Sequence, residues 1–168
     1  MKSRSGSAER SRLLASVQST CFSRTDVAVV DASFVVDLLD PQTGTSAPAP
    51  ILMRHLAATG TDLVAPSLLW LEVSNVLLTG IRRGRWDGGY ADAAYARCAQ
   101  LPIRTADIPI DRERAFEMAR RYDNWPVSDM VYVALAERLG TEFYTADDRL
   151  RARLAHLPWV LGLGTRTS

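Results

Sequence analysis

The sequence predicts an α/β fold built on a parallel or mostly parallel sheet. Short apolar runs rich in β-branched residues, typical of buried strands, alternate along the chain with longer stretches of helical periodicity. This alternation is typical of β-α-β units, in which helices cover the sheet. The 168 residues, 47% of them hydrophobic, are enough for one sizeable core and too few for two comfortable domains. We therefore expect a single domain.

The first half of the chain predicts two strands and three helices. VAVVDAS, from Val27, predicts a buried strand and FVVDLLD the helix that follows it. Residues 41–50, rich in Pro and small residues, predict a connection, ILMRHLAA a helix and TDLVAP a strand. Pro66 is expected at the first position of the next helix, SLLWLEVSNVLLTGIRR. This helix is apolar around most of its circumference, so we expect it to be deeply buried or to cover a partner.

The second half predicts three further helices and three strands. The helices are expected in GGYADAAYARCAQ, DRERAFEMARRY and SDMVYVALAERLG, with Asp111 and Ser128 as N-caps and Gly140 as a C-terminal stop. The strands are expected in LPIRT, TEFYT and LPWVLGL. Ligands of such folds bind at the carboxyl ends of the strands, where Asp31 and Asp147 are expected.

The N-terminal 25 residues differ in composition from the rest. They are rich in Ser and Arg and contain one acid, Glu9. We expect residues 1–25 to be a disordered extension or an over-extended start, and residues 26–168 to form the domain. A transit peptide and an arm that touches RNA are the alternatives.

Charge and cysteine content narrow the function classes only a little. The net charge of +1 argues against a nonspecific nucleic-acid coat but not against a local basic rim, and of the 20 cationic residues only Lys2 is a lysine. Cys21 and Cys98 are isolated, which fits a reducing, cytoplasmic compartment. No apolar run approaches the roughly 18 residues of a membrane span, so we expect a soluble protein with no membrane role.

Three acids occur at positions where acids often have only a structural role. Asp31 ends the first strand and Asp147 follows a later strand, so each of them could cap a helix or form a turn. Asp129 opens a helix, where a negative charge favours the helix dipole. Each acid taken alone is therefore weak evidence for chemistry.

Glu72 is harder to explain structurally. Helix geometry places it on one stripe with Leu68, Leu69, Asn75 and Val76, so its charge should be buried. Burying an unpaired carboxylate costs several kcal/mol, so a cation, a donor network or a proton must offset it. The folded part has no lysine, and an arginine partner is the structural alternative.

The four acids together predict a metal site. Asp31, Glu72, Asp129 and Asp147 can meet at one end of a parallel sheet, where they would repel each other unless a hard divalent cation binds. Oxygen ligands select Mg²⁺ or Mn²⁺, whereas zinc normally recruits His or Cys. His55 and His156 lie in neither acidic motif.

The chain resembles the PIN domain and, within it, the VapC-like ribonuclease toxins of toxin-antitoxin pairs. The matching pieces are VVDAS, APSLLWLEVSNVL, SDMVYVALAERLG and FYTADDRL, in the family's order, from about Val27 to near the C-terminus. The resemblance implies a three-layer α/β/α sandwich. Two features depart from the family: the N-terminal extension and the Pro-containing insertion at 41–50.

The resemblance also implies roles for individual residues. Asp31 and Asp129 would be the main Mg²⁺ ligands, Glu72 and Asp147 would complete the acidic pocket, and Ser33, Asn75 and Thr145 would support it. The implied activity is endonucleolytic cleavage of single-stranded RNA. Arginines after two of the motifs are candidate phosphate contacts, although a solvated face would explain any one of them: Arg82, Arg83, Arg85, Arg149, Arg151 and Arg153.

The implied partners are a VapB-like antitoxin, whose C-terminal segment would fill the groove, and a second copy in a homodimer. Trp70, Leu71 and Leu78 lie off the Glu72 stripe and support a covered surface.

Three other functions could use a parallel sheet of this kind. A response-regulator receiver needs a lysine near its phosphoryl group, which Lys2 in the N-terminal segment is not expected to supply. A haloacid-dehalogenase-type phosphatase needs a second Asp shortly after the first, where this chain has Ala32 and Ser33. The remaining alternative is a noncatalytic PIN-like module that binds RNA or protein, and the presence of all four acids speaks against it.

Overall fold

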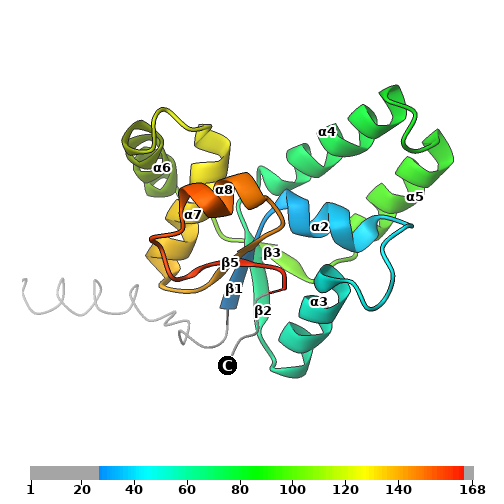
Figure 1. Cartoon of the computed structure of the whole chain (residues 1–168), viewed down its shortest axis with the longest axis horizontal. Helices are drawn as coiled ribbons and strands as arrows, with labels where there is room; N and C mark the ends of the chain where they lie inside the picture. Colours follow the sequence, from blue (N-terminus) through cyan, green and yellow to red (C-terminus); the bar gives the residue numbers. More distant parts are fainter. Residues whose placement is uncertain (1–26, 165–168) are drawn as a thin grey trace, which may run out of the picture.

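The computed structural model describes residues 27–164 and is centred on a sheet of five parallel strands (Figure 1). The strands lie in the order β3-β2-β1-β4-β5 and are β1 (Val27–Val30), β2 (Asp62–Ala65), β3 (Ile103–Thr105), β4 (Phe143–Thr145) and β5 (Val160–Gly162). Every residue of the central strand β1 is buried, as expected of a parallel strand covered on both faces. The predicted α/β fold with a parallel sheet is therefore confirmed.

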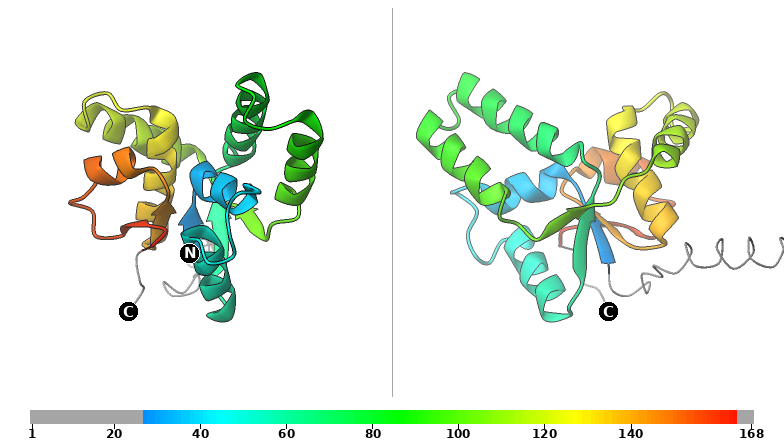
Figure 2. Two further views of the ribbon diagram at one scale, coloured as in Figure 1. Left: turned by 45° about the vertical axis from the view of Figure 1, so that its right-hand side comes forward. Right: turned by 180° about the vertical axis from the view of Figure 1, so that it is seen from behind.

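Helices cover both sides of the sheet and give the expected three layers (Figures 1 and 2). One side carries α2 (Ala32–Leu39), α3 (Pro48–Ala58), α4 (Leu69–Arg82) and α5 (Gly88–Cys98). The other side carries α6 (Pro109–Arg121), α7 (Val127–Leu139) and the short α8 (Asp148–Arg153). Helices α4 and α5 form a hairpin that projects beyond the sheet (Figure 2). Because the winding direction reverses at β1 and β4, a crevice opens where these neighbouring strands end.

The core lies between β1 and β4 and the helices on either side. Its fully buried side chains include Val29, Phe34, Leu69, Met130 and Phe143. Helix α7 is apolar on nearly all sides because it lies between the sheet and α6, and its residues from Met130 to Ala136 are all buried. The acids next to these elements are thus fixed to the most rigidly packed part of the domain.

Several predicted helix boundaries are wrong. Helix α4 begins at Leu69 rather than Pro66, because residues 66–68 form a turn closed by a Leu69 N–H to Pro66 C=O bond of 3.1 Å. The predicted connection at 41–50 ends early, since Pro48 already starts α3.

Two predicted N-caps are also wrong. Helix α6 begins at Pro109, and Asp111 instead lies in its first turn, where its carboxylate accepts from the Ile108 N–H at 3.0 Å. Helix α7 begins at Val127, so Ser128 lies in its first turn. Gly140 does end α7, in the left-handed conformation (φ 64°) that favours glycine.

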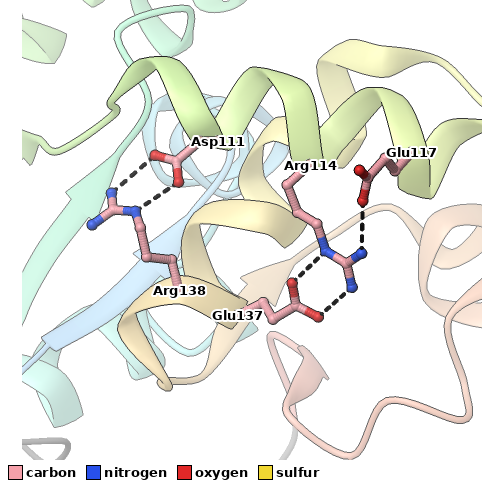
Figure 3. A network of polar contacts seen from close by, with 5 residues as sticks. All are labelled: Asp111, Arg114, Glu117, Glu137 and Arg138. Carbon is pink, nitrogen blue, oxygen red and sulfur yellow. Dashed lines mark hydrogen bonds and ion pairs between the residues drawn. The ribbon is translucent and has the colours of Figure 1, made fainter.

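Two arginine-carboxylate groups join α6 to α7 (Figure 3). Arg138 forms a two-bond ion pair with Asp111, which is 1% exposed, at 2.6 and 2.9 Å. Nearer the surface, Arg114 bonds Glu137 and Glu117. These contacts fix the position of α7, the helix that carries Asp129, relative to α6.

The expectation for residues 1–25 lies outside the described residues, and so does Cys21. Cys98 is buried and forms no disulfide with another described residue. Within residues 27–164, no helix combines the length and apolar character that a membrane span needs.

Candidate active site

Four carboxylates line one cavity of about 300 Å³ at the carboxyl ends of the strands. Asp31 directly follows β1, Glu72 lies in the first turn of α4, Asp129 in the first turn of α7, and Asp147 follows β4. Ser33, Asn75 and Tyr132 also line the cavity. We call it the acid pocket. The structure thus brings together the four acids that the sequence singled out.

Asp31 is the most deeply placed of the four, with 7% of its surface exposed. Its Oδ1 accepts bonds from Ser33 Oγ at 2.6 Å and from the Phe34 N–H at 3.0 Å, so it also caps α2. Burial raises the pKa of this carboxyl, although the hydroxyls of Ser33 and Thr145 and the Phe34 N–H oppose the shift. The capping role and a place in the acid pocket are therefore compatible.

Ser33 and Thr145 link the ends of β1 and β4. Ser33 Oγ accepts from the Ala146 N–H at 2.7 Å and lies 3.3 Å from Thr145 Oγ1, which accepts from the Asp147 N–H at 2.9 Å. Asp147 Oδ1 in turn accepts from the backbone N–H groups of Arg149 and Leu150 and caps α8. This chain of hydroxyl and backbone bonds fixes Asp147 relative to Asp31 across two strands.

Glu72 is half-buried and bonded to a tyrosine rather than an arginine. The Tyr132 hydroxyl, on α7, donates to Glu72 Oε2 at 2.6 Å. Tyr132 is 2% exposed and stacks against Phe143 with ring centroids 6.0 Å apart. Burial raises the pKa of Glu72, the tyrosine bond lowers it, and the charges of Asp129 and Asp31 raise it further. The arginine partner considered as an alternative for Glu72 is therefore not seen among the described residues.

Asp129 is held by an indole. Trp125 Nε1 donates to Asp129 Oδ2 at 2.6 Å. Burial raises the pKa of Asp129, and the neighbouring charge of Asp147 adds to the shift. Arg153 lies over the Trp125 ring at 5.0 Å and pairs with Asp123, so α8 supports the loop that carries the indole.

The electrostatics of the pocket favour a cation. None of the four acids forms an ion pair with an arginine of the described chain. Burial and mutual repulsion raise the pKa of three of them, Asp31, Glu72 and Asp129. Within residues 27–164, no three His, Cys, Asp or Glu side chains are already gathered as a metal-ligand group. The donor set is nevertheless all oxygen and negatively charged, which fits Mg²⁺ or Mn²⁺.

In a comparison with protein families, the model of the PIN domain matches residues 28–155. The chain belongs to the PIN-domain family. Ribonuclease VapC3 of Mycobacterium tuberculosis is 34% identical to this PIN domain over 122 residues, which cover 73% of this chain and 83% of the relative. The predicted resemblance to VapC-like ribonucleases is therefore confirmed.

Solved structures share the fold of this PIN domain. A protein of Pyrobaculum aerophilum matches with a TM-score of 0.61 at 20% identity, over 82% of this chain and 91% of its own. VapC20 of Mycobacterium tuberculosis, described as a sarcin-ricin loop cleaving toxin, matches with a TM-score of 0.58 at 20% identity, over 83% of this chain and 99% of its own. A chain of a toxin-antitoxin complex from Klebsiella pneumoniae matches with a TM-score of 0.55 at 19% identity, over 81% of this chain and 97% of its own. At these identities the structures show the fold alone.

Sequence reasoning missed Tyr132 and Trp125, the two donors that hold Glu72 and Asp129. Tyr132 falls within the predicted helix SDMVYVALAERLG, yet a buried tyrosine hydroxyl needs a partner, and Tyr132 lies one turn after Asp129. Trp125 lies four residues before Asp129, in the loop between α6 and α7, where the sequence predicts no helix or strand. The available indication was that a buried tyrosine hydroxyl and a buried indole N–H each need a hydrogen-bond acceptor.

The six candidate arginines lie outside the lining of the acid pocket. Four of them bond protein groups: Arg82 donates to Thr79, Arg85 pairs with Asp40, Arg151 with Asp148 and Arg153 with Asp123. The guanidinium groups of Arg83 and Arg149 form no ion pair within the described residues. These two are the candidates that have neither an ion pair nor a side-chain hydrogen bond in the described chain.

Proposed function

We propose that this PIN domain is a Mg²⁺-dependent endoribonuclease, with Mn²⁺ as an alternative ion, that cuts single-stranded regions of RNA. The observation that carries the proposal is the acid pocket: four carboxylates from four elements face one cavity and have no cationic side chain to balance them. The ribonuclease name of the 34% identical relative supports the same reaction class.

The residues would divide the work as follows. Asp31 and Asp129 would be the main ligands of the ion, and Glu72 and Asp147 would complete its surroundings. A bound divalent ion supplies a lowered pKa for water and charge stabilisation at the phosphate. Tyr132 and Trp125 would hold one oxygen of Glu72 and of Asp129, so that the other oxygen stays available. Ser33 and Thr145 would keep the spacing of Asp31 and Asp147.

The proposed biological role is that of a cytoplasmic toxin neutralised by a VapB-like antitoxin. One structure that shares the fold comes from a toxin-antitoxin complex. Helix α4 presents Leu71 and Leu78, which are 70% and 58% exposed, and an antitoxin segment would cover such a surface. A homodimer is the second assembly proposed for this chain.

The test is cleavage of a single-stranded RNA by purified protein. We expect cutting with Mg²⁺, none with excess EDTA, and a loss of at least about a hundredfold in Asp31→Asn and Glu72→Gln, because a missing ligand weakens both ion binding and charge stabilisation. Asp92→Asn, at an exposed acid on α5, is the matched control and should cut normally. If Asp31→Asn and Glu72→Gln cut as well as the wild type, the assigned site is wrong. An intact fold that binds RNA but never cuts it would favour the noncatalytic module.

A further inference from the structure

A second cavity, of about 310 Å³, lies next to the acid pocket along α4. Asn75 and Val76 line both cavities, so the two are contiguous. Beyond these shared residues the second cavity is lined by Thr79, Gly80, Arg83, Arg85 and Trp86. We call it the arginine pocket. Its volume is at the lower end of the range of small-molecule sites and is suited to a single nucleotide.

The end of α4 builds the back wall of the arginine pocket. Gly84, in the left-handed conformation (φ 68°), reverses the chain, and the Arg85 N–H returns to the Gly80 carbonyl at 2.9 Å. This turn folds Trp86 onto Gly80 so closely that a Cβ there would lie 2.2 Å from the indole. Trp86 is only 9% exposed, and the Arg85 guanidinium lies 4.5 Å from the centroid of its ring. The indole therefore shapes the wall and is not a free platform for a stacked base.

The two arginines of the pocket differ in how they are held. Arg85 pairs with the buried Asp40 and rests on Trp86, which fixes its position. Arg83 is exposed and forms no ion pair with any residue of the described chain. No acid lines this cavity, in contrast to the acid pocket beside it. A guanidinium without a protein partner, at the mouth of a cavity free of acids, suits a phosphate.

One face of α4 connects the two cavities. This face carries residues at helical spacings of three or four: Glu72, Val76, Thr79 and Arg83. From the first to the last of them the distance along the helix axis is about 16 Å, at 1.5 Å per residue. The Asn75 side chain lies exposed at the junction and forms no hydrogen bond with another described residue, so its amide is available to a ligand. An RNA strand can therefore place one phosphate beside the acids and a phosphate further along the strand beside Arg83.

We infer that the arginine pocket binds one nucleotide of the RNA strand to one side of the bond that is cut, with Arg83 on its phosphate. This inference rests on the proposed ribonuclease function. It adds a binding subsite that holds the RNA strand at a point away from the reacting phosphate. Asn75 and Thr79 supply the polar groups at its walls, and Arg85 with Trp86 supplies a rigid shape.

The test measures the binding of a fluorescent single-stranded oligonucleotide by anisotropy over a series of KCl concentrations. All proteins carry Asp31→Asn, so that no RNA is cut and the acid pocket is the same throughout. Arg83→Ala should raise Kd about tenfold, which corresponds to the loss of a charged hydrogen bond. It should also flatten the slope of log K against log salt by about 0.7, the value of one phosphate contact on a single strand.

Two further variants make the result specific. Arg83→Lys keeps the charge and should restore the salt slope while leaving binding weaker than in the arginine parent. Arg112→Ala removes another exposed arginine, on α6, which lines neither of the two pockets, and should change neither quantity.

Each contrary outcome overturns a different statement. If Arg83→Ala matches Arg112→Ala in Kd and salt slope while the protein with native Asp31 cuts RNA, the subsite is wrong and the proposed function stands. If the protein with native Asp31 neither binds nor cuts RNA, the proposed function fails and the subsite fails with it. If Arg83→Ala weakens only the binding of an antitoxin, the pocket docks a protein and the inference is overturned.

Discussion

The indole Nε1–H of Trp125 donates to Asp129 Oδ2 over 2.6 Å, so a loop residue outside every acidic motif orients a carboxylate of the acid pocket. Trp125→Phe removes this donor and keeps an aromatic ring under Arg153. Because partners that orient ligands typically contribute 10- to 100-fold to metal affinity, we expect Mn²⁺ affinity to fall by about tenfold. Isothermal titration calorimetry measures this affinity for Mn²⁺.

Trp159→Phe is the control for this prediction, since Trp159 is another partly buried tryptophan and lies just before β5, outside the acid pocket. Its Mn²⁺ affinity should equal that of the wild type. Equal affinities in all three proteins would show that the indole bond does not position Asp129.

Removing the Ser33 hydroxyl should destabilise the domain and not only its site. Ser33 Oγ bonds Asp31 Oδ1 and accepts from the Ala146 N–H, so Ser33→Ala leaves a backbone donor and a buried acid without this partner. We expect a loss of about 1–3 kcal/mol in the free energy of unfolding, measured with urea. Ser46→Ala, at an exposed serine before α3, should change stability by less than about 0.5 kcal/mol. Similar midpoints for the two variants would contradict this structural role.

The two ion-pair groups of Figure 3 should differ in their effect on stability. Arg138→Met leaves Asp111, which is 1% exposed, without its partner, and should cost about 3–5 kcal/mol because a buried charge remains unpaired. Arg114→Met breaks the more exposed contacts with Glu137 and Glu117 and should cost about 1 kcal/mol or less. Equal losses in thermal or urea unfolding would contradict the difference in burial.

The acid pocket should make metal-free protein less stable as the pH rises. Burial raises the pKa of Asp31, Glu72 and Asp129, so the folded state holds these protons more tightly than the unfolded chain. The resulting stabilisation is complete below the usual carboxyl pKa and is lost as the pH passes the raised folded values. In EDTA, the melting temperature of the wild type should therefore fall more steeply than that of Asp129→Asn as the pH rises above the usual carboxyl pKa of about 4. Melting temperatures that change with pH by the same amount in both proteins would contradict this prediction.

The sequence predicted the elements and the acids better than their connections. Strand β1 and helix α7 were found because apolar patterns report burial directly, and Gly140 because a left-handed helix end favours glycine. The start of α4 was wrong because the Asp107 carboxylate, 40 residues away, accepts from Ser67 and stabilises a turn that no local pattern encodes.

The site shows the same division between local and distant information. Asp31, Asp129 and Asp147 could be placed from strand and helix ends, since their positions depend on neighbours in the sequence. Tyr132 reaches Glu72 across 60 residues, and this contact depends on how α4 and α7 pack around the end of the sheet. Such pairings follow from tertiary packing and are not contained in motif spacing.

Direct binding of Mn²⁺ to the metal-free protein tests the central claim, that the four carboxylates form one divalent-cation site. Titration calorimetry compares the wild type with Asp31→Asn, in which the asparagine still caps α2, and with the surface control Asp92→Asn. We predict that the wild type and Asp92→Asn bind equally, and that Asp31→Asn binds at least about tenfold more weakly. Binding by a folded Asp31→Asn protein with the affinity of the wild type would contradict the account.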